Sequence, residues 1–476
     1  MKTRMMLAAS AAMLVLAGAA TAQTWGGPRA VLHDETTANS VILWTPGVGE
    51  VEWSPEDGIA GMPILLKDNI ETRDMPTTAG SLALADNAPG RDAPLVARLR
   101  EAGAVILGKT NLSEWANIRS SNSISGWSAV GGLTVNPYDR TRTACGSSSG
   151  SATAVATGLA PAAIGTETDG SITCPASVNG VVGFKPTVGL VSRTHIVPIS
   201  HSQDTAGPIA VDVATAATVL TAIAGTDPAD AATAEADQYR TDYRAALDAG
   251  SLRGARLGVL RYGVGNYSAE TQAAFEAALN SLRAAGAELV EITTAPQTPG
   301  IGQMELTVLM YELKADLNAY LASTDPAQVP TRTLADVIAF NEAEPRETVL
   351  FGQELFLVAE ATSGLDNPDY IAARANSLRM AGPEGIDRML SENNVVALVA
   401  PSTSRAWTND REDQDNGQGS ASRLPAIAGY PHLTVPMGLD RGMPVGISFI
   451  GAKWDDARIL SLGYAYEQSS PRPPRP

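Results

Sequence analysis

Two serine-bearing glycine turns, separated by a short alanine-rich run, constrain this chain more than any other feature. The first turn reads CGSSSGS from Cys145 to Ser151, and the second reads TETDGS from Thr166 to Ser171. The run at 152–159 has good helix propensity and follows a Ser/Gly segment suited to starting a helix. The pattern predicts turn, helix, turn, and the second turn can present consecutive N–H groups to a developing oxyanion.

The first turn also matches the G-x-S-x-G elbow of α/β-hydrolases, with Ser148 at its centre. That elbow requires a strand directly before it, whereas residues 136–144, NPYDRTRTA, are polar and turn-like. His432 would have to be the base, and only its late position in the chain supports it. A Ser148/His432 pair is therefore a rival interpretation. A flexible linker is disfavoured because GSSSGS is short and runs into ordered sequence.

A short apolar segment at 61–69, GMPILLKDN, predicts a buried strand that ends at Lys67. A lysine in such a place is usually a surface group whose stem packs along apolar side chains. A serine nucleophile, however, needs a base within hydrogen-bond reach, and no histidine lies near either turn in the sequence. Lysine qualifies only when burial lowers its ordinary pKa of about 10.4. Lys67 could meet this requirement, but the segment alone favours the surface interpretation.

Alternating helix and strand patterns predict the fold class. Residues 95–108 and 275–292 each read as an amphipathic helix, a stop glycine (Gly103 and Gly286) and a strand. Such units favour an α/β layered sheet. Further short strands are expected at 395–400, 433–436 and 445–450. One large sheet would then use both halves of the chain.

The first residues have the three-part layout of a secretory signal peptide. Lys2 and Arg4 precede an apolar run that ends in small residues at Ala20 and Ala22. We expect cleavage after Ala22 and export to the periplasm or the exterior, with no membrane association afterwards. An uncleaved anchor helix is the alternative, although the run is short for a bilayer. A formal charge of −17 argues against nucleic acid or an anionic membrane surface as a partner.

The two cysteines, Cys145 and Cys174, each lie within three residues of a serine in one of the two turns. In an exported protein they could form a disulfide, and two buried thiols are the alternative. The four histidines are scattered along the chain: His33, His195, His201 and His432. Because no ligand spacing is present, neither zinc nor a cofactor is expected.

Taken together, these motifs resemble the amidase signature family. The segments that carry the resemblance are G-x-P-x-x-x-K-D-N around Lys67, CGSSSGS, and GTETDGSITCPASVNGVVGFKPTVGLVS, with supporting segments between about residues 60 and 468. The phrases LSEWAN, SISGWSA, GTETDGSI, FGQELF and AGPEGID are most similar to the bacterial peptide amidases, which remove the amide from the C-terminus of peptides. The resemblance implies an α/β fold with a single large mixed β-sheet flanked by helices on both faces.

The family's residues carry over one at a time. The resemblance makes Ser171 the acyl-accepting nucleophile, Ser147 the bridging serine whose peptide bond is usually cis, and Lys67 the base. A serine hydroxyl is a weak nucleophile, and Ser147 could relay its proton to Lys67 and later return it to the departing ammonia.

The resemblance also places the oxyanion hole in the second turn, at the N–H groups of Thr168, Asp169, Gly170 and Ser171. Many members of the family have a pair of glycines before the nucleophile, where this chain has Asp169 and Gly170. The Asp169 side chain either orients the amide of the substrate or caps the turn.

The implied function is a serine amidohydrolase that converts a small peptide amide to the free acid and ammonia, without a cofactor. A broad aliphatic or aryl amidase or esterase, and a catalytically inactive exported binding protein, are the alternatives. The expected organisation is a signal peptide at 1–22, a divergent segment at 23–60, an amidase domain at 61–468 and a disordered tail at 469–476. We expect a monomer or a homodimer.

Overall fold

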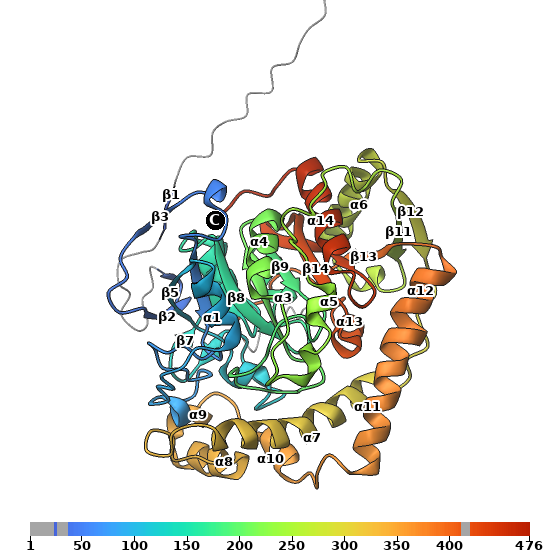
Figure 1. Cartoon of the computed structure of the whole chain (residues 1–476). Coiled ribbons are helices and arrows are strands. Elements are labelled where there is room, and N and C mark those ends of the chain that lie inside the picture. The colour runs from blue at the N-terminus through green and yellow to red at the C-terminus, as the bar shows by residue number, and fades with distance from the viewer. Residues whose placement is uncertain (1–22, 26–36, 411–418) are drawn as a thin grey trace, which may run out of the picture.

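An 11-stranded mixed sheet runs through the molecule (Figure 1). In spatial order its strands are β12 (Glu288–Ile292), β11 (Arg256–Leu260), β13 (Ala397–Pro401), β15 (Met443–Ile450), β14 (His432–Asp440), β9 (Val182–Lys185), β10 (Thr205–Ala210), β8 (Ala162–Glu167), β4 (Pro63–Lys67), β5 (Val105–Thr110) and β2 (Val41–Trp44). The pairs β12–β11, β11–β13, β8–β4 and β4–β5 are parallel, and the remaining neighbours are antiparallel. Both halves of the chain contribute strands, as the sequence predicted.

The computed structural model describes residues 23–25, 37–410 and 419–476. The predicted signal peptide at 1–22 lies outside the described residues, as does the part of the amino-terminal segment at 26–36. Within the described part of the chain, no helix combines the length and the apolar character needed to cross a bilayer.

The sheet buries both of its faces. Successive side chains of a strand point to opposite sides, so Ile64 and Leu66 of β4 pack into one core whereas Leu65 packs into another. The first core includes α1 (Pro94–Glu101), α4 (Val213–Ile223), α6 (Ala269–Ala284) and α14 (Asp456–Ser469). The opposite face is covered by α2 (Ser149–Ala156), α3 (Thr173–Val178), α12 (Asp387–Glu392) and α13 (Arg423–Ala428). The predicted fold class, a mixed sheet with helices on both faces, is confirmed.

The predicted stop glycines end their helices. Gly103 follows α1 and Gly286 follows α6, with φ angles of +90° and +98° that favour glycine. Strands β5 and β12 begin directly afterwards.

The helix predicted at 152–159 between the two turns is α2, which begins earlier, at Ser149. Its first turn lies against neighbouring backbone, since a Cβ atom at Gly150 would come within 2.3 Å of the carbonyl oxygen of Ser40. The helix ends before Gly158, which has a φ of +76°.

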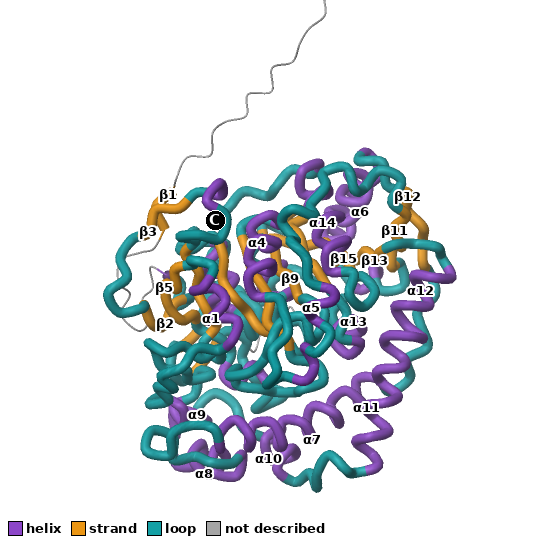
Figure 2. The backbone as a smooth tube through the Cα atoms, viewed as in Figure 1, coloured by secondary structure: helices purple, strands orange, loops and turns teal. Residues whose placement is uncertain are grey.

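A layer of helices lies outside the sheet, along the lower edge in Figure 1. It contains α7 (Ile301–Ala322), α8 (Leu334–Ala343), α10 (Glu354–Glu360) and α11 (Pro368–Ala381). Short elements complete the fold: β1 (Gln23–Trp25) pairs with β3 (Val51–Trp53), β6 (Trp127–Ser128) pairs with β7 (Gly132–Leu133), and α5 (Ala236–Tyr239) and α9 (Pro345–Thr348) are single turns. Figure 2 shows the strands as a central band between the helices.

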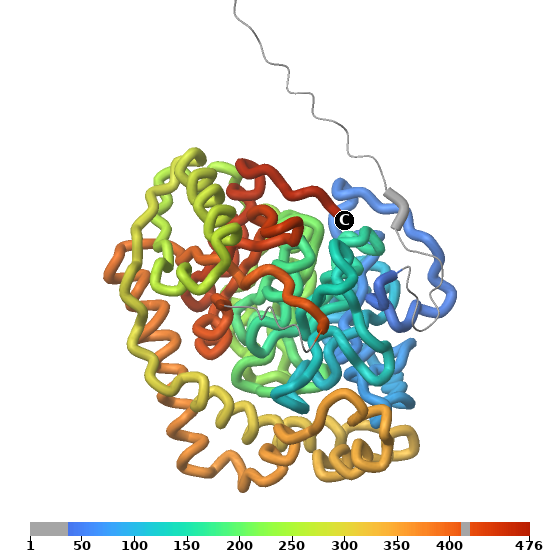
Figure 3. The backbone as a smooth tube through the Cα atoms, turned by 180° about the vertical axis from the view of Figure 1, so that it is seen from behind, coloured from blue at the N-terminus to red at the C-terminus, as the bar shows by residue number. Residues whose placement is uncertain are grey.

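The end of the chain runs back toward the amino-terminal side of the sheet (Figure 3). There the hydroxyl of Tyr138 donates to the carbonyl of Pro474 at 3.1 Å. Arg472 forms an ion pair with Glu467 at 2.6 Å.

Candidate active site

Lys67 is the last residue of the buried strand β4. Its side chain is 0% exposed, so it is not a surface lysine. The ammonium nitrogen Nζ donates to Ser147 Oγ at 2.7 Å, to Thr166 Oγ1 at 2.8 Å and to the carbonyl of Thr166 at 3.2 Å. Burial lowers the pKa of Lys67 to about 7, although the carboxylates of Asp204 and Glu167 act to raise it. Both the charged and the neutral amine are therefore accessible near neutral pH.

The two predicted turns lie side by side. The peptide bond between Gly146 and Ser147 is cis, as the resemblance implied. The N–H of Ser148 donates to the carbonyl of Ser171 at 3.1 Å, which ties the first turn to the second through the backbone.

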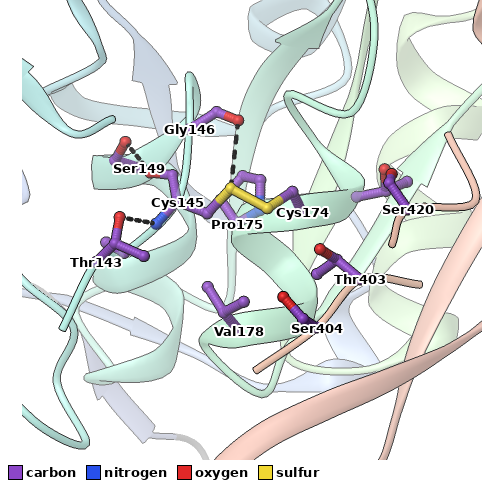
Figure 4. Close-up of a disulfide and its surroundings, with 12 residues drawn as sticks. Thr143, Cys145, Gly146, Ser149, Cys174, Pro175, Val178, Thr403, Ser404 and Ser420 are labelled. Carbon is purple, nitrogen blue, oxygen red and sulfur yellow. Dashed lines mark hydrogen bonds between the residues drawn. A yellow bond between two sulfur atoms is a disulfide. The ribbon is translucent and has the colours of Figure 1, made fainter. Parts of the chain in front are cut away.

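A disulfide links the first turn to α3, directly after the second turn (Figure 4). Cys145 and Cys174 are bonded, with their Cα atoms 6.1 Å apart. Of the two alternatives left open by the sequence, the structure contains the disulfide. The N–H of Cys145 donates to Thr143 Oγ1 at 3.0 Å, and Ser149 Oγ donates to the carbonyl of Cys145 at 2.5 Å. The backbone directly before Ser147 is thus held by covalent and hydrogen bonds.

Ser171 lies at the end of the second turn with 9% of its surface exposed. Among the described residues, no hydrogen bond involves its hydroxyl, and the backbone N–H groups of 168–171 donate to no other group. Gly170 has a φ of +80°, a conformation that favours glycine. The turn therefore offers consecutive N–H donors beside a hydroxyl, which is the arrangement expected of an oxyanion hole.

Hydrogen bonds of Thr168 hold the second turn in place. Its hydroxyl donates to Asp204 Oδ1 at 2.6 Å, and Asp204 Oδ2 accepts from the N–H groups of Ile199 and Ser200 at 2.8 and 2.9 Å. Burial raises the pKa of Asp204 to about 6, against these hydrogen bonds. The Gln203 side chain donates to the carbonyl of Thr168 at 3.3 Å.

Four polar residues around the turn were not singled out from the sequence. Gln203 and Asp204 belong to the segment SQDTAGPIA, whose resemblance to the family was the available signal. Glu305 on α7 and Arg423 on α13 had no such signal. Glu305 accepts from Gln203 Nε2 at 3.2 Å and from Arg423 Nε at 3.2 Å.

Two cavities border the second turn. One, of about 430 Å³, is lined by the disulfide, Asp169, Gly170, Trp407 and Arg423. The other, of about 370 Å³, reaches the opposite side of the turn at Thr166 and Thr168 and extends to α7. Both volumes fall in the range of small-molecule sites, so the turn is accessible to a ligand.

The rival pair Ser148 and His432 does not form. Ser148 Oγ donates to the carbonyl of Thr166 at 3.1 Å and accepts from its N–H at 3.2 Å. The imidazole Nε2 of His432 lies 2.6 Å from Ser448 Oγ on the neighbouring strand. Burial, followed by the charge of Lys185, lowers the pKa of His432 to about 3. Both side chains are occupied with holding the fold together.

One potential metal-ligand group lies in the described residues, at His201, Glu312 and Asp316. The sequence spacing had not indicated it. His201 Nδ1 lies 2.9 Å from Asp316 Oδ2, and Glu312 Oε1 accepts from Tyr370 at 2.8 Å. Glu312 also accepts from Ser202 N–H at 3.0 Å. These hydrogen bonds account for the grouping, and we assign no metal to it.

Comparison with known proteins gives concordant matches. The family model described as Amidase matches residues 50–460. The native peptide amidase from Stenotrophomonas maltophilia is 49% identical in sequence, with a TM-score of 0.85 that covers 92% of this chain and 91% of that chain. An amidase family protein from Bacillus anthracis is 37% identical, with a TM-score of 0.79 over 88% of this chain and 79% of that chain. A probable amidase from Arabidopsis thaliana is 41% identical over 420 residues, which is 86% of this chain and 77% of that protein.

Proposed function

The chain belongs to the amidase family, and from this premise we propose that it hydrolyses the C-terminal amide of peptides to the free acid and ammonia. It is a hydrolase of amide bonds that is structurally close to peptide amidase. The observation that carries the proposed chemistry is the 2.7 Å contact from Lys67 Nζ to Ser147 Oγ, inside a buried site beside Ser171. The peptide substrate is supported by the similarity to the Stenotrophomonas maltophilia enzyme over 92% of this chain.

In the proposed mechanism, Ser171 is the nucleophile and neutral Lys67 is the base. Lys67 takes a proton from Ser147, which in turn takes the proton of the Ser171 hydroxyl as Oγ attacks the amide carbon. The hydrogen bond from the N–H of Ser148 to the carbonyl of Ser171 holds the two turns together, and the relay requires the Ser171 hydroxyl to reach Ser147 Oγ. The carbonyl oxygen becomes an oxyanion that accepts from the N–H groups of 168–171.

Collapse of the tetrahedral intermediate breaks the C–N bond. The leaving nitrogen receives the proton that Lys67 holds, through Ser147, and departs as ammonia. The acyl group stays on Ser171 as an ester. A water molecule then attacks that ester by the same proton route, and the acid is released with Ser171 restored.

Ammonia release tests the proposal. The panel consists of an amidated dipeptide such as Ala-Phe-NH2, two simple amides (butyramide and benzamide) and the ester p-nitrophenyl butyrate, whose hydrolysis is followed by nitrophenol. We expect kcat/KM for the peptide amide to exceed that for the simple amides by at least about tenfold, because only the peptide fills a cavity of the observed size. Equal values would remove the peptide preference and leave a broad amidase. No turnover of any substrate, together with no labelling of Ser171 by a fluorophosphonate probe, would leave a binding protein.

We also propose that the protein acts outside the cytoplasm. The predicted leader is one support, and the Cys145–Cys174 disulfide is a second, because disulfides persist mainly in oxidising compartments. Fractionation of cells that express the full chain tests this. Activity found only in the cytoplasmic fraction would contradict it.

A further inference from the structure

Asp169 is an acidic residue of the second turn that lines a cavity. It stands two residues before Ser171 and lines the 430 Å³ cavity beside the disulfide. Its Oδ1 atom is buried and has no hydrogen-bond partner among the described residues. No protein donor in that part of the chain engages Oδ2 either. An acceptor oxygen that no protein donor engages is available to a donor from outside.

Glu305 is a second buried acid, and it interacts with Asp169. This residue is 6% exposed, and its oxygens accept from Gln203 and Arg423, each at 3.2 Å. Burial, followed by the charge of Asp169, raises the pKa of Glu305. Two neighbouring carboxylates avoid repulsion when one of them holds a proton. A proton shared between the two acids would occupy one oxygen of Asp169 and leave the other as the acceptor for a ligand.

The size of the cavity indicates which part of a substrate meets Asp169. The leaving group of the proposed reaction is ammonia, whose volume is close to that of a water molecule, about 30 Å³. A space of about 430 Å³ is far larger than that, and suits the acyl part of a substrate. The donor that Asp169 receives therefore belongs to the acyl part.

We propose that the Asp169 carboxylate accepts a hydrogen bond from an N–H group on the carbon next to the reacting carbonyl. In a peptide amide this group is the backbone N–H of the C-terminal residue, and in an amino-acid amide it is the α-ammonium. Asp169 is then a specificity-determining residue. The inference rests on the proposed function, and it explains why an aspartate, and not a glycine, stands at 169: simple amides and esters lack this donor.

Exchange of one atom in the substrate tests the inference. N-acetyl-leucinamide is compared with 2-acetoxy-4-methylpentanamide, in which an ester oxygen replaces the N–H and the shape is kept, and ammonia release is measured for both. A hydrogen bond to a charged group is worth about 1.5 to 3 kcal/mol, so the wild type should prefer the N–H substrate about 10- to 100-fold in kcat/KM. In Asp169→Ala the ratio should fall to about one. A general distortion of the turn would lower both rates and leave the ratio unchanged.

Two further variants sharpen the result. Asp169→Asn keeps the shape of the side chain and should give an intermediate ratio, and it replaces the alanine variant if the latter does not fold. Asp237→Ala removes an exposed aspartate from α5 and should keep the wild-type ratio. Leucinamide, measured in parallel, separates the two donors. If Asp169→Ala loses more kcat/KM on leucinamide than on N-acetyl-leucinamide, the α-ammonium is the preferred group. If it loses less, the backbone N–H is preferred.

The outcomes for the inference and for the proposed function are distinct. Failure of the wild type to release ammonia from any of these amides would defeat the proposed function. Turnover with the same N–H preference in the wild type and in both Asp169 variants would overturn the inference alone. A wild-type enzyme that does not discriminate between the two acyl groups would also overturn it.

Discussion

The charge of Lys67 is the most direct test of the proposed mechanism. An ordinary lysine with a pKa of about 10.4 is neutral in roughly one molecule in 2500 at pH 7. Burial lowers the pKa of Lys67 to about 7, so about half of the molecules have a neutral amine at that pH. The buried site thus increases the population of the neutral amine about a thousandfold. Below pH 7, kcat/KM should fall about tenfold per pH unit, and above it kcat/KM should level off.

Substitution of Asp204 should shift the pKa of Lys67 and so tests this prediction. Among the charged neighbours that favour the ammonium form of Lys67, it has the largest effect on the Lys67 pKa. Asp204→Asn removes that charge while keeping a side chain that accepts from Thr168 Oγ1. The midpoint of the kcat/KM profile should therefore move below the wild-type value of about 7. Because burial raises the pKa of Asp204 itself to about 6, the difference between the two enzymes should be clear above pH 6 and shrink below it.

The assay is ammonia release from an amidated dipeptide between pH 5 and 9 at constant ionic strength. The kcat/KM profile reports the ionisation of the free enzyme. Glu276→Gln is the matched control, because it removes an exposed carboxylate on α6 that pairs with Arg261. Its profile should coincide with that of the wild type. A wild-type rate that does not change between pH 5.5 and 8.5 would show that the base is not Lys67.

Further outcomes are expected from single changes. Ser171→Ala should lower kcat by about 10⁴-fold or more and abolish fluorophosphonate labelling, and residual labelling at another serine would contradict the assignment. Lys67→Met should abolish hydrolysis. Between pH 7 and 10 unfolded Lys67 binds a proton that the folded residue lacks, so the stability of the wild type increases with pH. The variant should lack this rise in Tm. His432→Gln should keep kcat within about threefold while unfolding costs about 1 to 3 kcal/mol less, whereas loss of activity at unchanged Tm would restore His432 as a base. The double variant Cys145→Ala/Cys174→Ala opens a loop with a sequence separation of 29 and should cost about 3 to 4 kcal/mol of stability. It should lower kcat more than it changes KM. A change in KM alone would contradict a role of the disulfide in holding the turns.

Local patterns were enough to predict the framework of the site. The strand that ends at Lys67 follows from a short apolar run, and the helix ends at Gly103 and Gly286 follow from glycine in a positive φ conformation. The two serine turns were found because glycine and serine have strong local preferences. In each case the signal is contained in about ten consecutive residues.

The remaining parts depend on contacts between distant segments. Glu305 lies on α7, and its contacts with Gln203 and Arg423 span 102 and 118 residues. A glutamate on an amphipathic helix is normally solvated, and no periodicity distinguishes one that is buried beside an aspartate. The disulfide was left open for a similar reason, because spacing does not fix whether two Cα atoms come within bonding range.

Glu167 binds the first N–H groups of α3, so that the N–H groups of the second turn stay available for a substrate oxygen. Its Oε2 atom accepts from the N–H groups of Ile172 and Thr173, at 2.7 and 2.9 Å, at the start of α3. The first N–H groups of a helix have no partner within the helix, and without this carboxylate they would compete for the same oxygen. Glu167 is 1% exposed and satisfies these donors from the protein side. Among the described residues, the N–H groups of 168–171 therefore stay unpaired, next to the hydroxyl of the proposed nucleophile. In the proposed mechanism, Glu167 thereby determines which N–H groups can bind the oxyanion, and Asp169, two residues further on, is free to contact the acyl group.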